Sequence, residues 1–134
     1  MRLHTISAIA LALALVPVGY AQENPLYTLY FDTGSTKVNA KAAEVVAKAL
    51  PQIKKCQDNG VRVWGNTDTS YSDSESSTLA TERARAVKDY LISKGIPDSR
   101  IAWVGHSKAR PAVPTADGVK EPKNNRVEIR LVCD

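Results

Sequence analysis

The sequence predicts an α/β fold, an α+β sandwich in which a mixed four-stranded sheet carries two helices packed on one face. Short runs of β-favouring residues alternate with two longer segments of helical periodicity, in the order β-α-β-α-β-β. Two β-α-β crossovers place both helices on the same face of the sheet. The last strand follows a plain loop, so we expect it to run antiparallel to its neighbours. No internal repeat or linker divides the chain.

The first strand and first helix are predicted from the opening third of the sequence. Residues 26–31 are rich in aromatic and β-favouring side chains, and the strand stops at the turn residues 32–35. Asn39 is expected to cap the helix, and Pro51, which has no amide hydrogen, to disturb its last turn. Residues 59–60 end this segment. The apolar face recurs at three- and four-residue steps: Ala42, Ala43, Val46, Ala49, Leu50 and Ile53.

The second half of the chain repeats this alternation. Residues 61–64 alternate as a second strand, and residues 67–78, almost all Ser, Thr, Asp and Glu, are expected to form a solvated loop. Helical spacing begins at Leu79, and Gly95 is expected to end that helix in a left-handed conformation. The remaining predicted elements are a third strand, a loop with three prolines and a last alternating strand: 101–104, 110–123 and 127–132.

The N-terminus has the layout of a secretory signal peptide. Arg2 precedes an apolar run over residues 6–18, and Gly19 and Ala21 are the small residues of a cleavage site. We expect cleavage after Ala21, which leaves residues 22–134 as a single periplasmic domain; an uncleaved anchor is the alternative. The apolar run is shorter than the ~20 residues of a membrane span, and no direct membrane span is expected after cleavage.

Several function classes are disfavoured by the sequence. The formal net charge is only +4, and basic residues are scattered without interleaved aromatics, so nucleic acid is not an expected partner. Gly-x-Ser-x-Gly, His-Glu-x-x-His and clusters of metal ligands are absent. His106 is the only histidine after the signal segment, and the adjacent Ser107 points elsewhere on a strand end. We therefore expect no catalytic residues, metal or cofactor.

Two cysteines, Cys56 and Cys133, are predicted to form a disulfide, because an exported chain meets an oxidising compartment. Their spacing excludes a C-x-x-C redox or zinc motif. Cys56 ends the first helix and Cys133 ends a strand expected to run antiparallel to the second strand. Both therefore fall at one edge of the domain, opposite the loops that follow the first and second strands.

Four motifs follow one another along the chain: Phe31-Asp32, Gly65-Asn66-Thr67-Asp68, Leu79 with Arg83-Ala84, and the segment from Pro111 through Asp117-Gly118 to Asn124-Asn125-Arg126-Val127-Glu128-Ile129. In this order they resemble the OmpA-like domain family, which comprises the peptidoglycan-binding C-terminal domain of outer-membrane protein A and its relatives. The sequence departs from the family pattern mainly around the binding loop. The departures are Asn66 for His, Tyr71 for Gly, Glu75-Ser76 for Tyr-Asn, Ala80 for Ser and Asn125 for Arg.

The resemblance implies that Asp68 and Arg83 bind the diaminopimelate of the peptidoglycan stem peptide, whose side chain ends in an ammonium and a carboxylate. We expect Arg83 about one turn into the second helix, partly exposed like Asp68, with its guanidinium gripping the carboxylate through two hydrogen bonds beside a helix N-terminus that favours an anion. The simpler alternative is that the two charges pair with each other or with water. Possible further contacts are Thr33, Gly34, Thr67, Thr69 and Tyr71.

The expected function is non-covalent binding of peptidoglycan, contributing to attachment or integrity of the cell envelope at the wall or outer membrane. An envelope protein is a candidate further partner. The alternative is a periplasmic interaction or structural module of the same fold that has lost the ligand. A small wall hydrolase or esterase is a third reading, for which the sequence assembles no active site. Asn124 and Arg126 are expected to hold the last strand and its loop in place.

Overall fold

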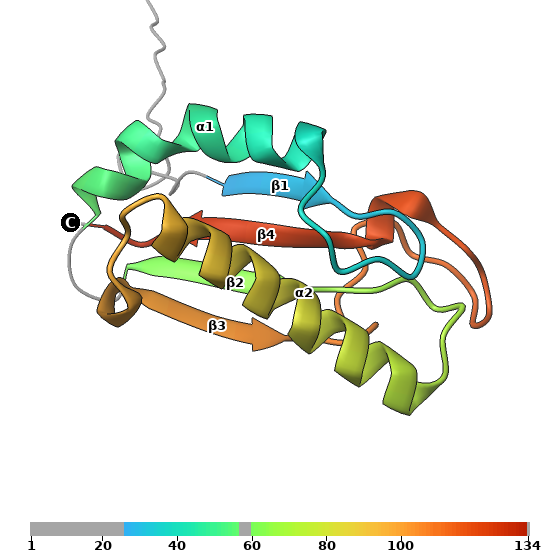
Figure 1. Cartoon of the computed structure of the whole chain (residues 1–134). Helices are drawn as coiled ribbons and strands as arrows, with labels where there is room; N and C mark the ends of the chain where they lie inside the picture. The colour runs from blue at the N-terminus through green and yellow to red at the C-terminus, as the bar shows by residue number, and fades with distance from the viewer. Residues whose placement is uncertain (1–25, 57–59, 134) are drawn as a thin grey trace, which may run out of the picture.

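The computed structural model describes residues 26–56 and 60–133, and it has the predicted two-layer architecture (Figure 1). One mixed sheet has the strand order β1-β4-β2-β3, and its strands are β1 (Leu26–Tyr30), β2 (Val61–Gly65), β3 (Ile101–Gly105) and β4 (Arg126–Leu131). Both helices pack on one face, as predicted: α1 (Ala40–Lys55) and α2 (Asp73–Ser93). Two short 3-10 helices precede the last two strands: η2 (Asp98–Arg100) and η3 (Pro122–Asn124).

Strand pairing confirms that the last strand runs antiparallel to its neighbours. β4 lies between β1 and β2 and is antiparallel to both, whereas β2 and β3 are parallel. Gly65 at the end of β2 faces Val127, and Tyr30 at the end of β1 faces Arg126. The ends of β1 and β2 therefore meet the start of β4 at one edge of the sheet.

The core lies between the sheet and the helices. Alternate strand residues face the helices because successive side chains of a strand point to opposite faces. Fully buried members of the core include Leu29, Val46, Ile53, Val63, Val87, Leu91, Val127 and Ile129. On the opposite face, the Trp64 ring lies against the guanidinium groups of Arg110 and Arg130, at 5.3 and 4.6 Å.

Helix α1 begins as predicted. The side chain of Asn39 accepts a hydrogen bond from the amide of Ala42 at 2.9 Å, which satisfies one of the free N–H groups at the helix start. Pro51 lies inside the helix, which ends at Lys55. Residue 59, where we expected the segment to end, lies outside the described residues.

Helix α2 begins six residues earlier than predicted. Ser72 caps it by accepting from the amide of Glu75 at 3.2 Å, and the acidic residues Asp73 and Glu75 occupy the first turn. The expectation of a solvated loop over 67–78 was therefore wrong. Capping and the helix dipole offset the low helix propensity of Ser, Thr and Asp. At the other end, Gly95 has a φ of 97°, the left-handed stop that we predicted.

Two glycines let α2 lie directly on the ends of β2 and β3. A Cβ at Gly65 would overlap the carbonyl oxygen of Ala80, and a Cβ at Gly105 would lie 2.6 Å from the amide nitrogen of Thr81. Both obstacles are helix backbone, so any side chain at these positions would push the helix away. This close approach brings the middle of α2 against the segment that follows β2.

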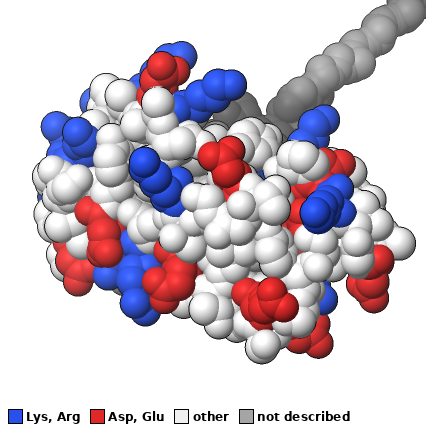
Figure 2. All heavy atoms as spheres, turned by 45° about the vertical axis from the view of Figure 1, so that its right-hand side comes forward, with Lys and Arg blue, Asp and Glu red and all other residues white. Residues whose placement is uncertain are grey.

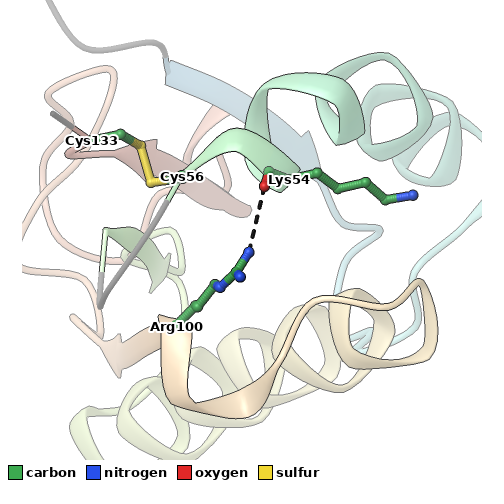
Figure 3. Close-up of a disulfide and its surroundings, with 4 residues drawn as sticks. All are labelled: Lys54, Cys56, Arg100 and Cys133. Carbon is green, nitrogen blue, oxygen red and sulfur yellow. Dashed lines mark hydrogen bonds between the residues drawn. A yellow bond between two sulfur atoms is a disulfide. The ribbon is translucent and has the colours of Figure 1, made fainter.

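The predicted disulfide between Cys56 and Cys133 is present, with a Cα–Cα distance of 5.0 Å (Figure 3). It ties the end of α1 to the segment after β4. Beside it, Arg100 Nη1 donates to the carbonyl oxygen of Lys54 at 3.4 Å. The ends of α1 and β4, which the disulfide joins, lie at the end of the domain opposite the loops that follow β1 and β2 (Figure 1).

Loss of this disulfide is expected to lower the free energy of unfolding by about 3 kcal/mol, because the cross-link closes a long loop in the unfolded chain. Urea unfolding of the oxidised and the dithiothreitol-reduced protein, followed by circular dichroism, measures the difference. A double Cys56→Ala/Cys133→Ala variant serves as the control, since a reducing agent should not change its stability. Equal stability of oxidised and reduced protein would contradict the prediction.

No helix in the described part of the chain is both long enough and apolar enough to cross a membrane. The segment that we expect to be a signal peptide, 1–21, lies outside the described residues. Its cleavage after Ala21 stays a prediction.

Candidate functional site

The predicted ligand residues come together at the sheet edge where β1 and β2 end and β4 begins. Three loops meet there: 31–39 after β1, 66–72 after β2, and 106–125 before β4. They lie together at the right-hand end of the domain in Figure 1. Arg83 reaches this edge from α2 because the two strand-end glycines let the helix approach closely.

Arg83 is fully buried, with 0 % of its surface exposed. Nε donates to the carbonyl of Ser35 at 2.8 Å, and Nη2 donates to that of Asp32 at 3.2 Å. Nη1 donates to the carbonyl of Asn66 and to Oδ1 of Asn125, both at 2.9 Å. A guanidinium has five N–H groups, so these bonds leave one on Nη2. Arg83 thus ties the loops after β1 and β2 to the start of β4.

These contacts correct three expectations about Arg83. Its side chain is buried, not partly exposed. Four of its N–H groups already donate hydrogen bonds, so it can add one bond to a carboxylate and not the two that we expected. It also lies ten positions after Asp73, about 15 Å along α2 by helix rise. The dipole at the helix N-terminus therefore does not act at Arg83, since that effect fades within the first turn.

Asp68 is also buried, at 1 % exposure, which contradicts the expected partial exposure. Its Oδ1 accepts from the backbone amide and the hydroxyl of Ser70, at 2.9 and 2.5 Å. Its Oδ2 accepts from the amide of Glu121 at 3.1 Å and from Nδ2 of Asn125 at 2.9 Å. The four bonds fill the acceptor sites of a carboxylate. Of the four donors, the Ser70 hydroxyl is the one free to rotate away.

Asn125 joins the two charged residues. Its Oδ1 accepts from Arg83 and its Nδ2 donates to Asp68. No ion pair within 4.0 Å links Asp68 directly to Arg83, so the simpler alternative of direct pairing is wrong. We noted Asn125 only as a departure from the family pattern. The antiparallel pairing of β2 with β4 was the signal for its role, because it sets the start of β4 beside the end of β2.

Three of the possible further contacts lie together beside Arg83. Thr33 and Gly34 form the exposed turn after β1, where Gly34 has a φ of 70°. The Tyr71 hydroxyl oxygen accepts from the Gly34 amide at 2.8 Å. Burial lowers the pKa of Arg83, and the nearby Tyr71 hydroxyl and Asp68 carboxylate partly offset this. A depression of about 450 Å³ adjoins Tyr71 and is also lined by Glu75 and Glu82.

The other two possible contacts face different parts of the structure. Thr67 is buried, and its amide donates to the carbonyl of Ser107 at 2.9 Å. Thr69 fastens the proline-rich loop: its hydroxyl donates to the carbonyl of Ala116 at 2.7 Å and accepts from the amide of Val119 at 3.1 Å. Both residues therefore join the loop after β2 to the loop before β4.

Asn124 and Arg126 hold the last strand and its loop, as expected. Oδ1 of Asn124 accepts from the amides of Ala112 and Val113, at 2.8 and 2.9 Å, and Arg126 pairs with Glu128 at 3.0 Å. The His106 ring packs edge-on against Trp64, with ring centroids 5.1 Å apart. Among residues 26–56 and 60–133, no cluster of three or more His, Cys, Asp or Glu side chains is placed to hold a metal.

The protonation of Asp68 links the site to folding. Burial raises its pKa, but the hydrogen bonds from Ser70, Asn125 and Glu121 together outweigh burial and hold the pKa below 3.8. A depressed folded-state pKa means that the unfolded chain binds the proton more tightly. The stability that this carboxylate contributes is therefore complete well above pH 4 and is lost as the pH falls through the folded pKa.

We accordingly expect the free energy of unfolding to fall more steeply below about pH 4 in the wild type than in Asp68→Asn, which has no proton to gain there. Urea unfolding of both proteins between about pH 2.5 and 6 measures this. Asp89→Asn is the control, because Asp89 is exposed on α2 and the variant should keep the wild-type pH profile. Parallel profiles for wild type and Asp68→Asn would contradict the prediction.

The surface around the site carries charges of both signs. On the face shown in Figure 2, Lys and Arg side chains are interspersed with Asp and Glu side chains, and uncharged surface separates them. This arrangement agrees with the scattered basic residues of the sequence.

Comparison with known proteins identifies relatives over most of the chain. The chain is 34 % identical over 111 residues to an outer membrane protein of Gluconacetobacter diazotrophicus, covering 78 % of this chain and 29 % of that protein. It is 34 % identical over 86 residues to the peptidoglycan-binding protein ArfA of Mycobacterium bovis, covering 64 % and 26 %. This chain thus spans less than a third of either relative.

The fold has a counterpart among solved structures. The peptidoglycan-associated lipoprotein of Burkholderia pseudomallei superposes with a TM-score of 0.69 at 23 % identity, covering 78 % of this chain and 88 % of that one. The model of the OmpA family matches residues 30–125, which contain α1 to η3 and every residue that hydrogen-bonds to the side chain of Asp68 or Arg83. The chain therefore belongs to the OmpA family.

Proposed function

We propose that this chain binds peptidoglycan non-covalently in the periplasm, through the zwitterionic end of diaminopimelate in the stem peptide. The observation that carries the proposal is one buried cation and one buried anion, Arg83 and Asp68, fixed together through Asn125 at the sheet edge. The name of a relative, the peptidoglycan-binding protein ArfA, supports peptidoglycan as the ligand.

Each charge has one contact that a ligand can take over. Arg83 has one N–H on Nη2 that no carbonyl or Asn125 accepts, with the Tyr71 hydroxyl nearby, and the Gly34 amide donates only to that phenol oxygen. A carboxylate is a stronger acceptor than a phenol, so it suits these donors better. Asp68 can exchange the rotatable hydroxyl of Ser70 for an ammonium. Glu75 and Glu82 line the adjoining depression, and their negative charge favours the same ammonium.

In this role the protein is a binding module rather than an enzyme. We propose that the exported chain, after loss of residues 1–21, contributes to attachment or integrity of the envelope, and that an envelope protein partner supplies any tie to the outer membrane. The second candidate is an interaction module that has lost the ligand. The fully buried Arg83 and the hydrogen bond between Tyr71 and Gly34 favour this second candidate.

Changing the ligand tests the proposal more cleanly than changing buried residues. Sacculi that contain diaminopimelate should retain the protein with a dissociation constant between about 1 μM and 1 mM, because ordering the flexible peptide offsets part of the contact energy. Sacculi with Lys at the same position lack the extra carboxylate, and binding should be at least about tenfold weaker, the loss of one charge-assisted hydrogen bond.

Sedimentation of purified protein with each type of sacculus gives both constants. Equal binding to the two would reject diaminopimelate as the recognised group while leaving wall binding in place. Absence of binding to both would reject the proposal and leave the second candidate. Addition of excess free diaminopimelate is the specificity control and should release the protein from the sacculi that contain diaminopimelate.

A further inference from the structure

Tyr71 is fixed at both ends. Its hydroxyl oxygen accepts from the Gly34 amide at 2.8 Å, across 37 positions of sequence. Its backbone carbonyl accepts from Nζ of Lys108 at 3.0 Å, and Lys108 also forms an ion pair with Asp73 at 3.0 Å. The side chain therefore spans from the start of α2 to the turn after β1, beside the guanidinium of Arg83.

The Tyr71 hydroxyl presents an oxygen to the donors that would otherwise receive an anion. The Gly34 amide donates to this oxygen. The Tyr71 hydroxyl is also close enough to the guanidinium to raise the pKa of Arg83, although burial lowers that pKa by more. Arg83 is fully buried although one of its N–H groups lacks an acceptor among the described hydrogen bonds. The depression lined by Gly34 and Tyr71 opens to solvent next to this point.

The geometry points to Tyr71 as an internal occupant of the carboxylate position, which a ligand must displace and which thereby sets the affinity and selectivity of the site. This inference rests on the proposed function. A ligand gains only if its acceptor is better than the phenol that it replaces. An ionised carboxylate meets that condition, whereas a neutral carboxamide brings no charge and gains little. The site should therefore select free diaminopimelate ends over amidated ones.

The occupant also lowers the apparent affinity. When only a fraction of the molecules has the open site, the apparent dissociation constant is the intrinsic one divided by that fraction. Removing the occupant removes this factor. Tyr71→Gly takes away the hydroxyl and the ring, while Tyr71→Phe is the matched variant that keeps the ring and loses only the hydroxyl, with its bond to Gly34 and its effect on Arg83.

The test is calorimetric titration of the exported chain and its two variants with a soluble stem peptide that ends in meso-diaminopimelate. Tyr71→Gly should bind about tenfold more tightly than wild type, the factor for an open form populated to about a tenth. Tyr71→Phe should fall between them. Wild type should bind the amidated peptide much more weakly than the free one, and Tyr71→Gly should bind the amidated peptide measurably.

A second measurement follows the hydrogen bond itself. Amide hydrogen exchange at Gly34 should be faster in Tyr71→Phe than in wild type, and ligand should slow it in both. If wild type binds and both variants bind equally or more weakly, Tyr71 is no competitor and the inference fails while the proposed function stands. If neither wild type nor variant binds any peptide, the proposed function and the inference fail together. Binding by Tyr71→Gly alone supports the inference in its strongest form.

Discussion

Gly65→Ala is expected to lower the free energy of unfolding by about 4 kcal/mol or more, beyond the range of ordinary overpacking. The added Cβ would overlap the carbonyl oxygen of Ala80 and lie 3.1 Å from the amide nitrogen of Ala84. Both atoms belong to the backbone of α2, so no side-chain rotation relieves the contact. The helix has to move off the sheet, and Arg83 moves with it.

Urea unfolding followed by circular dichroism measures this loss. Gly118→Ala is the matched control, because Gly118 has open space around it but a φ of 79°. Its cost should be that of the left-handed backbone alone, about 1–2 kcal/mol. If Gly65→Ala costs no more than Gly118→Ala, α2 does not approach the end of β2 as closely as described.

Arg83→Ala is expected to cost about 4 kcal/mol of stability, because it removes a fully buried donor group that four acceptors in three loops share. The carbonyls of Ser35, Asp32 and Asn66 and the side-chain oxygen of Asn125 all lose a bond. Their mutual arrangement rests on the guanidinium, so the loops that form the site should loosen together. Loss of binding in this variant would therefore report on folding as well as on ligand contact.

Arg85→Ala is the matched control for this variant. Arg85 lies two positions along the same helix, is exposed, and pairs with Glu82 at 3.4 Å on the surface. Its removal should cost less than about 1 kcal/mol. Thermal and urea unfolding of both variants and of the wild type measure the two losses of stability. Similar losses for both would mean that Arg83 is not the hub of the three loops.

The fold was predictable because its signals are periodic. Alternation located all four strands to within one residue, and the plain loop before β4 indicated its antiparallel direction. The start of α2 was missed because Ser, Thr, Asp and Glu suit both loops and first helical turns. The pattern Ser72-x-x-Glu75 is a capping-box signature that distinguishes the two, and the structure shows its hydrogen bond from the Glu75 amide to the Ser72 hydroxyl.

The site was predictable in its members but not in its geometry. The family motifs identified Asp68 and Arg83, and the predicted order of strands and helices placed them at the same edge of the sheet. Charged residues are rarely fully buried without partners, so the sequence indicated exposed side chains. Both charges can be buried because other groups satisfy their hydrogen bonds. The backbone carbonyls of Asp32 and Ser35 accept from Arg83, and the side-chain amide of Asn125 accepts from Arg83 and donates to Asp68. Backbone carbonyls are present at every position and give no signal in a sequence.

The position of β4 in the sheet constrains the order in which the protein folds. β1 and β2 hydrogen-bond to β4 and not to each other, so the chain's final strand fills the gap between its first two. During synthesis, residues 26–125 can form helices and the parallel β2–β3 pair, but β1 has no strand to join until residues 126–131 emerge. Such late, long-range pairing slows folding. The nascent chain should therefore leave β1 unpaired until residues 126–131 have been synthesised.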